Sequence, residues 1–131
     1  MSVPNPQNQA TMIVRNGPLL GPVLSRVIGM LAARAQCPID RLDDALLVAD
    51  TVAAHGPDYT VNGAIRVQLT AREGVIELVV AALRPRGASE MLAAAELPGV
   101  GNVLERVADA VEVRSEGDHE SLYIRLGFGA D

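Results

Sequence analysis

The chain has 131 residues, about half of them apolar, which is enough for a single domain with its own core. Its net charge of -5 and its shortage of aromatic side chains argue against a nucleic-acid-binding surface, which is usually basic and stacks bases on rings. The single cysteine excludes an intramolecular disulfide, and no run approaches the roughly 20 apolar residues that cross a bilayer. We therefore expect a cytoplasmic protein that contacts neither nucleic acid nor membrane.

The first 38 residues predict a tail, a strand and a helix. Residues 1–9 are rich in Pro, Asn and Gln without periodicity, which predicts a flexible tail ahead of a single domain over residues 10–128. Residues 11–15 are expected to form the first strand. From Pro18 onward apolar residues recur at helical spacing, and Cys37-Pro38 ends the helix because proline disfavours helix in the residue before it.

A second helix is predicted from Asp40 to His55. Asp43 and Asp44 lie in its first turns, where carboxylates meet the positive end of the helix dipole. Its apolar stripe is wide, which predicts deep burial against a sheet. The stripe consists of Ile39, Leu42, Leu46, Ala49 and Ala53, widened by Ala45, Val48 and Val52.

The pattern then changes to the alternation typical of strands. Residues 65–70 and 76–80 alternate apolar and polar side chains around the turn AREG, which predicts a β-hairpin. Residues 88–96 have high helix propensity, and a further helix is expected after Gly99-Val100-Gly101. Residues 111–126 predict a closing hairpin around the turn SEGDH.

This order of elements predicts an α+β fold. We expect a two-layer α/β sandwich with a mixed, mostly antiparallel sheet that is covered by helices on one face. A doubly wound fold would need strands that alternate singly with helices, and the chain lacks that pattern.

Two strings in these elements carry a resemblance to a known family. They are DDALLVAD (Asp43 to Asp50) and GVGNVLERVADAVEV (Gly99 to Val113). In this order they resemble the histidine-kinase-like ATPase superfamily, in particular the small bacterial anti-sigma factors with serine-kinase activity, over about residues 11–126. The resemblance implies the histidine-kinase-like ATPase fold.

The first string corresponds to the helix that, in the family, carries a catalytic acid and, four residues later, a magnesium-binding asparagine. Asp50 stands at the position of the acid and Ala54 at that of the asparagine. Alanine offers no oxygen to a metal. An alignment on His55-Gly56 places Leu47 and Thr51 at these positions instead, which removes the acid and leaves only a hydroxyl.

The family's adenine-binding aspartate should follow the strand of residues 76–80, where this chain reads AALRPRG. Ala81 and Ala82 cannot accept a hydrogen bond from the adenine amine through their side chains. Arg84-Pro85-Arg86 replaces the small residues that let the nucleotide approach. The side chains at the position of the adenine motif therefore offer no hydrogen-bond acceptor for adenine.

Gly99, Gly101 and Asn102 stand where the family's phosphate loop lies, and free amides at a helix start can bind phosphate. The pattern lacks the lysine of a P-loop and the third glycine of a dinucleotide fingerprint, so tight loop geometry before a helix is the favoured interpretation. Two of the three site motifs thus lack their chemistry. The resemblance implies a degenerate member without Mg-ATP binding or kinase activity.

The remaining candidate residues have structural interpretations. His55 lies in the last turn of its helix, where a histidine interacts well with free carbonyls and the negative end of the dipole. His55, His119 and Cys37 lack the short paired spacings of zinc sites, so no metal is expected. A lone cysteine after a helix is expected to be part of the core.

The leading hypothesis is a regulatory protein with no catalytic residue and no cofactor, which binds a sigma factor or an anti-sigma antagonist. Its candidate partner-binding residues are Arg26 and Arg34 on the first helix and Arg84 and Arg86 in the turn. A homodimer is implied only by the family. The alternative is an active ATP-dependent serine-protein kinase with Asp50 as its catalytic acid, and a third hypothesis is an unrelated α+β ligand-binding domain.

Overall fold

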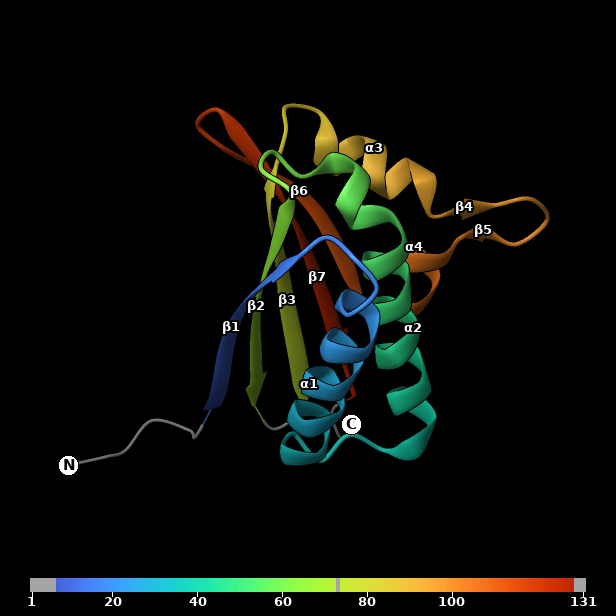
Figure 1. The fold of residues 1–131 in the computed structure, drawn as a ribbon. Coiled ribbons are helices and arrows are strands. Elements are labelled where there is room, and N and C mark those ends of the chain that lie inside the picture. The colour runs from blue at the N-terminus through green and yellow to red at the C-terminus, as the bar shows by residue number, and fades with distance from the viewer. Residues whose placement is uncertain (1–6, 73, 129–131) are drawn as a thin grey trace.

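The structure is a computed structural model that describes residues 7–72 and 74–128. Figure 1 shows two layers, a sheet and a group of helices over one of its faces, which confirms the expected two-layer α+β architecture. In chain order the elements are β1 (Gln7–Arg15), α1 (Leu20–Arg34), α2 (Ile39–His55), the short 3-10 helix η1 (Gly56–Tyr59), β2 (Ala64–Arg72), β3 (Val75–Leu83), α3 (Gly87–Ala94), β4 (Glu96–Leu97), β5 (Gly101–Asn102), α4 (Val103–Val107), β6 (Ala110–Glu116) and β7 (His119–Gly127). None of the helices in the described ranges has the length and apolar character needed to span a membrane.

The five long strands form one sheet in the order β1-β2-β3-β7-β6, and each neighbouring pair in it is antiparallel. The expected mixed sheet is therefore wrong as far as residues 7–72 and 74–128 are concerned. The cause lies in the connections. Between β1 and β2 the chain makes two helical passes in opposite directions, so it re-enters the sheet at the end where β1 stopped and must run antiparallel to it (Figure 1).

β1 begins earlier than predicted. Residues 7–9 pair in register with residues 70–72 of β2, so they belong to the sheet and not to a tail. Residues 1–6 of the predicted tail lie outside the described residues. An edge strand is held by the hydrogen bonds of its neighbour, so its polar side chains need not show the alternation that identifies a strand in a sequence.

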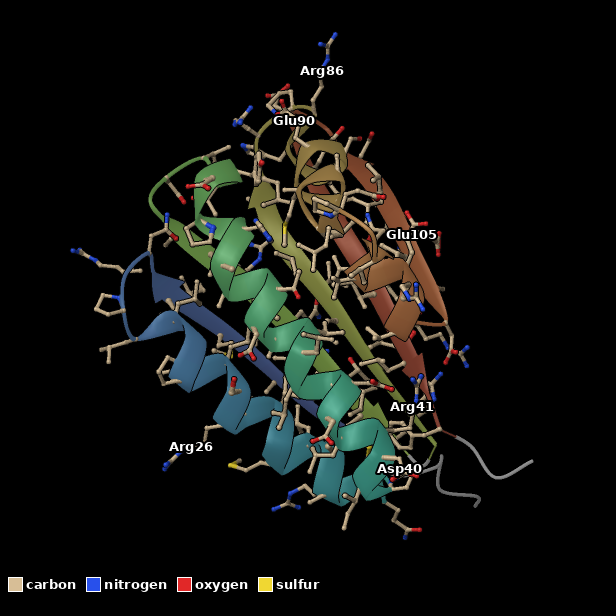
Figure 2. The ribbon with its side chains drawn as sticks, turned by 90° about the vertical axis from the view of Figure 1, so that its right-hand side faces the viewer. Arg26, Asp40, Arg41, Arg86, Glu90 and Glu105 are labelled. Carbon is tan, nitrogen blue, oxygen red and sulfur yellow. The ribbon has the colours of Figure 1, made fainter. Side chains whose placement is uncertain are left out.

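The core lies between the sheet and the α1–α2 layer. α2 contributes Ala45, Val48, Ala49 and Val52, which are fully or almost fully buried. Ile39 is 79% exposed, so its predicted place in the buried stripe is wrong. The first turn of α2 lies at the rim of the molecule, as Figure 2 shows for the neighbouring Asp40, and there is little protein there for Ile39 to pack against.

The segment between β3 and β6 forms shorter elements than predicted. α3 ends at Ala94, α4 has five residues, and between them β4 and β5 form a two-stranded arm that projects from the body (Figure 1). Gly99 and Gly101 take positive φ angles of 77° and 96°, which glycine adopts readily and which let the chain reverse. Strands of two residues show no alternation, so the arm had no sequence signal.

Candidate functional site

The outer side of the second half of α2 carries Asp50 and Ala54, the two positions that the resemblance assigns to acid and metal. Both side chains are exposed, and Asp50 makes no ion pair within 4.0 Å with any described residue. In the alternative alignment the Thr51 hydroxyl donates to the Leu47 carbonyl of its own helix at 2.8 Å, and Leu47 is 41% exposed. That hydroxyl is therefore already bonded one turn back along the helix.

His55 is the last residue of α2 and is half-buried. The chain continues directly into η1, and the Gly56 amide donates to the Val52 carbonyl as the helix ends. His119 lies in the β6–β7 hairpin and Cys37 between α1 and α2, so these three residues come from separate elements. Within the described ranges no three His, Cys, Asp or Glu residues form a group that could hold a metal ion.

The protein beneath the end of α2 is filled by apolar side chains. Leu83, at the end of β3, and Met91, on α3, are both 0% exposed. Gly56 is also buried, and a Cβ added to it would lie 2.5 Å from Cδ1 of Ile65 and 3.8 Å from Cε of Met91. The helix end, β2 and α3 therefore pack closely, and a methyl group at Gly56 would have to displace Cδ1 of Ile65.

The positions that the resemblance assigns to the adenine motif lie inside β3, because this strand runs to Leu83 and not only to Val80 as predicted. Ala81 is buried and Ala82 half-buried, and the Ala82 carbonyl accepts a hydrogen bond from the Val61 amide at 3.3 Å. Beyond them, the amide of Ala88 at the start of α3 donates to Oε1 of Glu120 on β7 at 3.0 Å. A carboxylate of the protein itself therefore occupies the positive end of this helix, where an anion of a ligand would otherwise be favoured.

The two arginines of the RPRG turn differ in their contacts. Arg84 pairs with Glu90 at 2.8 Å, and its guanidinium carbon lies 5.2 Å from the centre of the Tyr59 ring. Arg86 has a left-handed backbone, with φ of 67°, and Figure 2 shows its side chain pointing away from the body. Arg84 is therefore paired with a nearby residue, whereas Arg86 makes no ion pair within 4.0 Å with the described residues.

The glycine motif forms the turn of the β4–β5 arm. The Val100 amide donates to the Leu97 carbonyl at 3.0 Å, and the Val103 amide to the Ala95 carbonyl at 3.0 Å. Asn102 caps α4: its Oδ1 accepts from the Glu105 amide at 3.1 Å, and its Nδ2 donates to the Leu92 carbonyl at 2.7 Å. The amides of Val100, Val103 and Glu105 are thus bonded within the protein. Gly99 and Gly101 thus lie in a tight turn directly before α4.

Arg41 and Glu120 are two well-bonded residues that the sequence did not single out. Arg41 on α2 pairs with Asp44 at 2.7 Å and donates to the carbonyls of Val107 and Gly127 at 3.0 and 3.1 Å. The spacing of Arg41 and Asp44 on one helix was the only available signal, since every other partner comes from a distant part of the chain. Both residues connect elements of the two layers.

Cys37 follows α1 and is partly buried, with its thiol donating to the Pro38 carbonyl at 3.4 Å. Burial raises the pKa of the Cys37 thiol above its ordinary value, while the nearby Arg41 guanidinium partly opposes this shift. The thiolate is the nucleophilic form of cysteine, so the raised pKa makes this residue a poor nucleophile at neutral pH. The environment is that of a structural cysteine.

Tyr123 lies on the sheet face that the helices leave uncovered. Its hydroxyl donates to Oε2 of Glu77, and the Arg114 guanidinium carbon lies 4.0 Å from the centre of its ring. Burial, followed by the hydrogen bond to Glu77 and the charge of that carboxylate, raises the pKa of the Tyr123 phenol above its ordinary value, although Arg125 and Arg114 oppose the shift.

We expect the Tyr123 phenol to ionise at higher pH than free tyrosine, whose pKa is about 10. In Tyr59→Phe only Tyr123 remains, so its phenolate absorbance can be titrated without overlap from a second tyrosine. Because the folded pKa exceeds the unfolded one, the stabilising contribution of the neutral phenol is complete below pH of about 10 and is lost as the pH rises through the folded pKa. Adding Glu77→Gln should lower the midpoint. A midpoint at or below that of free tyrosine would contradict the assignment.

No known protein family matches this chain, and no curated protein is significantly similar to it. The geometry of the described residues is therefore what supports a function.

Proposed function

We propose that this chain is a regulatory, protein-binding domain that resembles a partner-switching anti-sigma factor and does not bind Mg-ATP. The main observation behind this proposal is that polar groups near the positions that the resemblance assigns to a nucleotide site are already hydrogen-bonded within the protein. Both polar atoms of the Asn102 side-chain amide are hydrogen-bonded. The Glu120 carboxylate accepts a hydrogen bond from the Ala88 amide at the start of α3. At the metal and adenine positions, Ala54 and Ala82 have only methyl groups to offer.

A stripe on the outer side of α1 supports the protein-binding part of the proposal. It consists of Leu19, Val23, Arg26, Met30 and Arg34, which recur every three or four residues and are all exposed. Leu19 is 68% and Met30 57% exposed, and Figure 2 shows Arg26 pointing away from the protein. Exposed apolar side chains in a row with arginines are typical of the surfaces that bind other proteins. The partner would be a sigma factor, an antagonist domain or a second copy of this chain.

The alternative function is an active serine-protein kinase. The observation in its favour is that Asp50 is exposed and has no ion-pair partner among the described residues, so its carboxylate is accessible. A kinase would still need ligands for magnesium, and the residue one turn after Asp50 is Ala54. The two functions differ directly in whether the protein binds a nucleotide.

We expect isothermal titration calorimetry with Mg-ATP to show no binding at millimolar nucleotide. Ala54→Asn, which restores the asparagine at an exposed helix position, should not create binding, because the adenine acceptor is still missing. Micromolar binding by the unmodified protein would overturn the proposal and favour the kinase. Strong binding by Ala54→Asn alone would show that the adenine and phosphate contacts are intact, which would also contradict it.

A further inference from the structure

The chain turns from β1 into α1 through a corner that contains a hollow. The hollow has a volume of about 370 Å³ and is lined by Ile13, Arg15, Leu19 and the residues between them. Ile13 is 70% and Leu19 68% exposed, although both are large apolar side chains. This volume suits one or two apolar side chains, and burying the exposed surface of Ile13 and Leu19 against them would be favourable.

The corner is held rigidly by bonds to other parts of the chain. Nδ2 of Asn16 donates to the Pro57 carbonyl at 3.2 Å and to Oγ1 of Thr60 at 3.1 Å. The Asn16 amide donates to the Gly63 carbonyl at 2.9 Å. A binding site whose shape exists before the partner arrives loses less entropy on binding. The hollow is therefore a preorganised feature of the fold.

Two arginines lie beside the hollow. Ile13 is directly paired with Arg66 of β2, and Arg15 follows two residues later on the same face of β1. Both arginines are exposed, and neither makes an ion pair within 4.0 Å with a described residue. Two exposed guanidinium groups beside an apolar hollow provide complementary contacts for carboxylates next to an apolar side chain.

The charge of the whole sheet face favours an acidic protein over a nucleic acid. Strand register places five arginines and three glutamates on this face, so its net charge is positive although the chain carries -5. These side chains are Arg15, Arg66, Arg72, Arg114, Arg125, Glu77, Glu112 and Glu116. A continuous run of phosphates would meet Glu77 and Glu112, and Arg114 covers the Tyr123 ring that could stack a base. Separated carboxylates avoid both obstacles.

We propose that the β1–α1 corner binds an acidic segment of another protein, whose apolar side chain fills the hollow against Ile13 and Leu19 while its carboxylates pair with Arg15 and Arg66. The corner continues into the α1 stripe through Leu19, so the inference rests on the proposed protein-binding function and adds the chemistry of the partner. It does not depend on the loss of nucleotide binding.

The test uses the full chain and a short fluorescein-labelled peptide of alternating glutamate and valine, with fluorescence anisotropy as the readout. We expect saturable binding that weakens as salt rises, because exposed charges are screened. The double variant Arg15→Gln/Arg66→Gln should weaken binding by about ten-fold or more. Ile13→Ala should weaken it by about three-fold, through lost apolar contact. Arg125→Gln, on the same face but across the sheet on β7, is the matched control and should change it less than about two-fold.

Several outcomes would overturn the proposal. These are no binding of the peptide, equal loss with Arg125→Gln and with the double variant, or equal binding of a peptide with lysine in place of glutamate. Single-stranded oligothymidylate that binds at the corner as tightly as the peptide would assign the site to nucleic acid. Self-association that the double variant abolishes in sedimentation velocity would assign it to a second copy. Peptide binding together with Mg-ATP binding would refute only the proposed function, and failure of both would refute only this inference.

Discussion

Replacing Arg41 with alanine is expected to lower the free energy of unfolding by about 2–3 kcal/mol, because hydrogen bonds to a charged donor are lost and their acceptors stay partly buried. The Arg41 guanidinium joins the start of α2 to the carbonyls of Val107 and Gly127, at the ends of α4 and β7. It also lies 2.7 Å from Asp44 and 3.5 Å from Asp109. Its side chain is only 24% exposed, so water can replace these donors only in part.

Arg41→Lys is expected to lose about half of that stability, because a single ammonium group cannot reproduce the fork that reaches two carbonyls in different directions. Urea unfolding of both variants measures the effect. Arg34→Ala is the matched control, since Arg34 is exposed and lies at the end of the neighbouring helix. If lysine fully preserved the stability, the charge near Asp44 and Asp109 would be what matters, and the geometric role assigned to Arg41 would be wrong.

The long elements could be predicted because each of them carries its own periodic signal. The apolar residues of α1 recur at helical spacing, and the buried positions of β2 alternate with exposed ones. These signals depend only on neighbouring residues, so α1, α2 and the two hairpins are confirmed within a few residues of their predicted bounds. The helices also lie on one face of the sheet, as the order of elements indicated (Figure 1).

Features that depend on pairing between distant segments could not be predicted. β1 begins at Gln7 because β2 provides a partner as far as Arg72, and polar residues carry no mark of this. Ile39 fits the apolar period of α2, but its exposure depends on where the sheet ends beneath the helix. Local periodicity predicts neither the start of β1 nor the exposure of Ile39, because both are determined by tertiary structure.

In the candidate site, too, local features could be predicted from the sequence and contacts between distant residues could not. Asp50 and Ala54 could be placed on the outer side of α2 from helical spacing alone, since the buried side was clear. The contact of Glu120 with the Ala88 amide joins residues 32 positions apart. The bonds of Asn102 to Leu92 likewise needed the β4–β5 arm, which had no sequence signal. Motif matching therefore named candidate positions, and only the structure showed which of their polar groups are hydrogen-bonded within the protein.

Gly56→Ala is expected to destabilise the protein by about 2 kcal/mol through overpacking, even though alanine is the better helix former. Gly56 has helical angles, φ of -53° and ψ of -43°, so the backbone itself accepts alanine. The obstacle is Cδ1 of Ile65, which would lie 2.5 Å from the new Cβ. Ile65 is 0% exposed and can move that atom only into other packed side chains.

A double-mutant cycle isolates this contact. Ile65→Val alone should cost about 1 kcal/mol, and it removes the atom that Gly56→Ala would meet. In the Ile65→Val background, Gly56→Ala should be neutral or slightly stabilising, which gives a coupling energy of about 2 kcal/mol. Gly29→Ala in α1, where an added Cβ meets nothing within 4 Å, is the control for helix propensity and should stabilise the protein by about 0.5–1 kcal/mol.

The result also bears on the function of the end of α2. If Gly56→Ala were tolerated without Ile65→Val, the region between α2, β2 and α3 would have spare volume, and this volume would be available to a ligand beneath Asp50. If the cycle shows the expected coupling, Gly56, Ile65 and Met91 form one packed unit in solution. A helix end that is closely packed on its inner side leaves only its outer surface accessible to a partner.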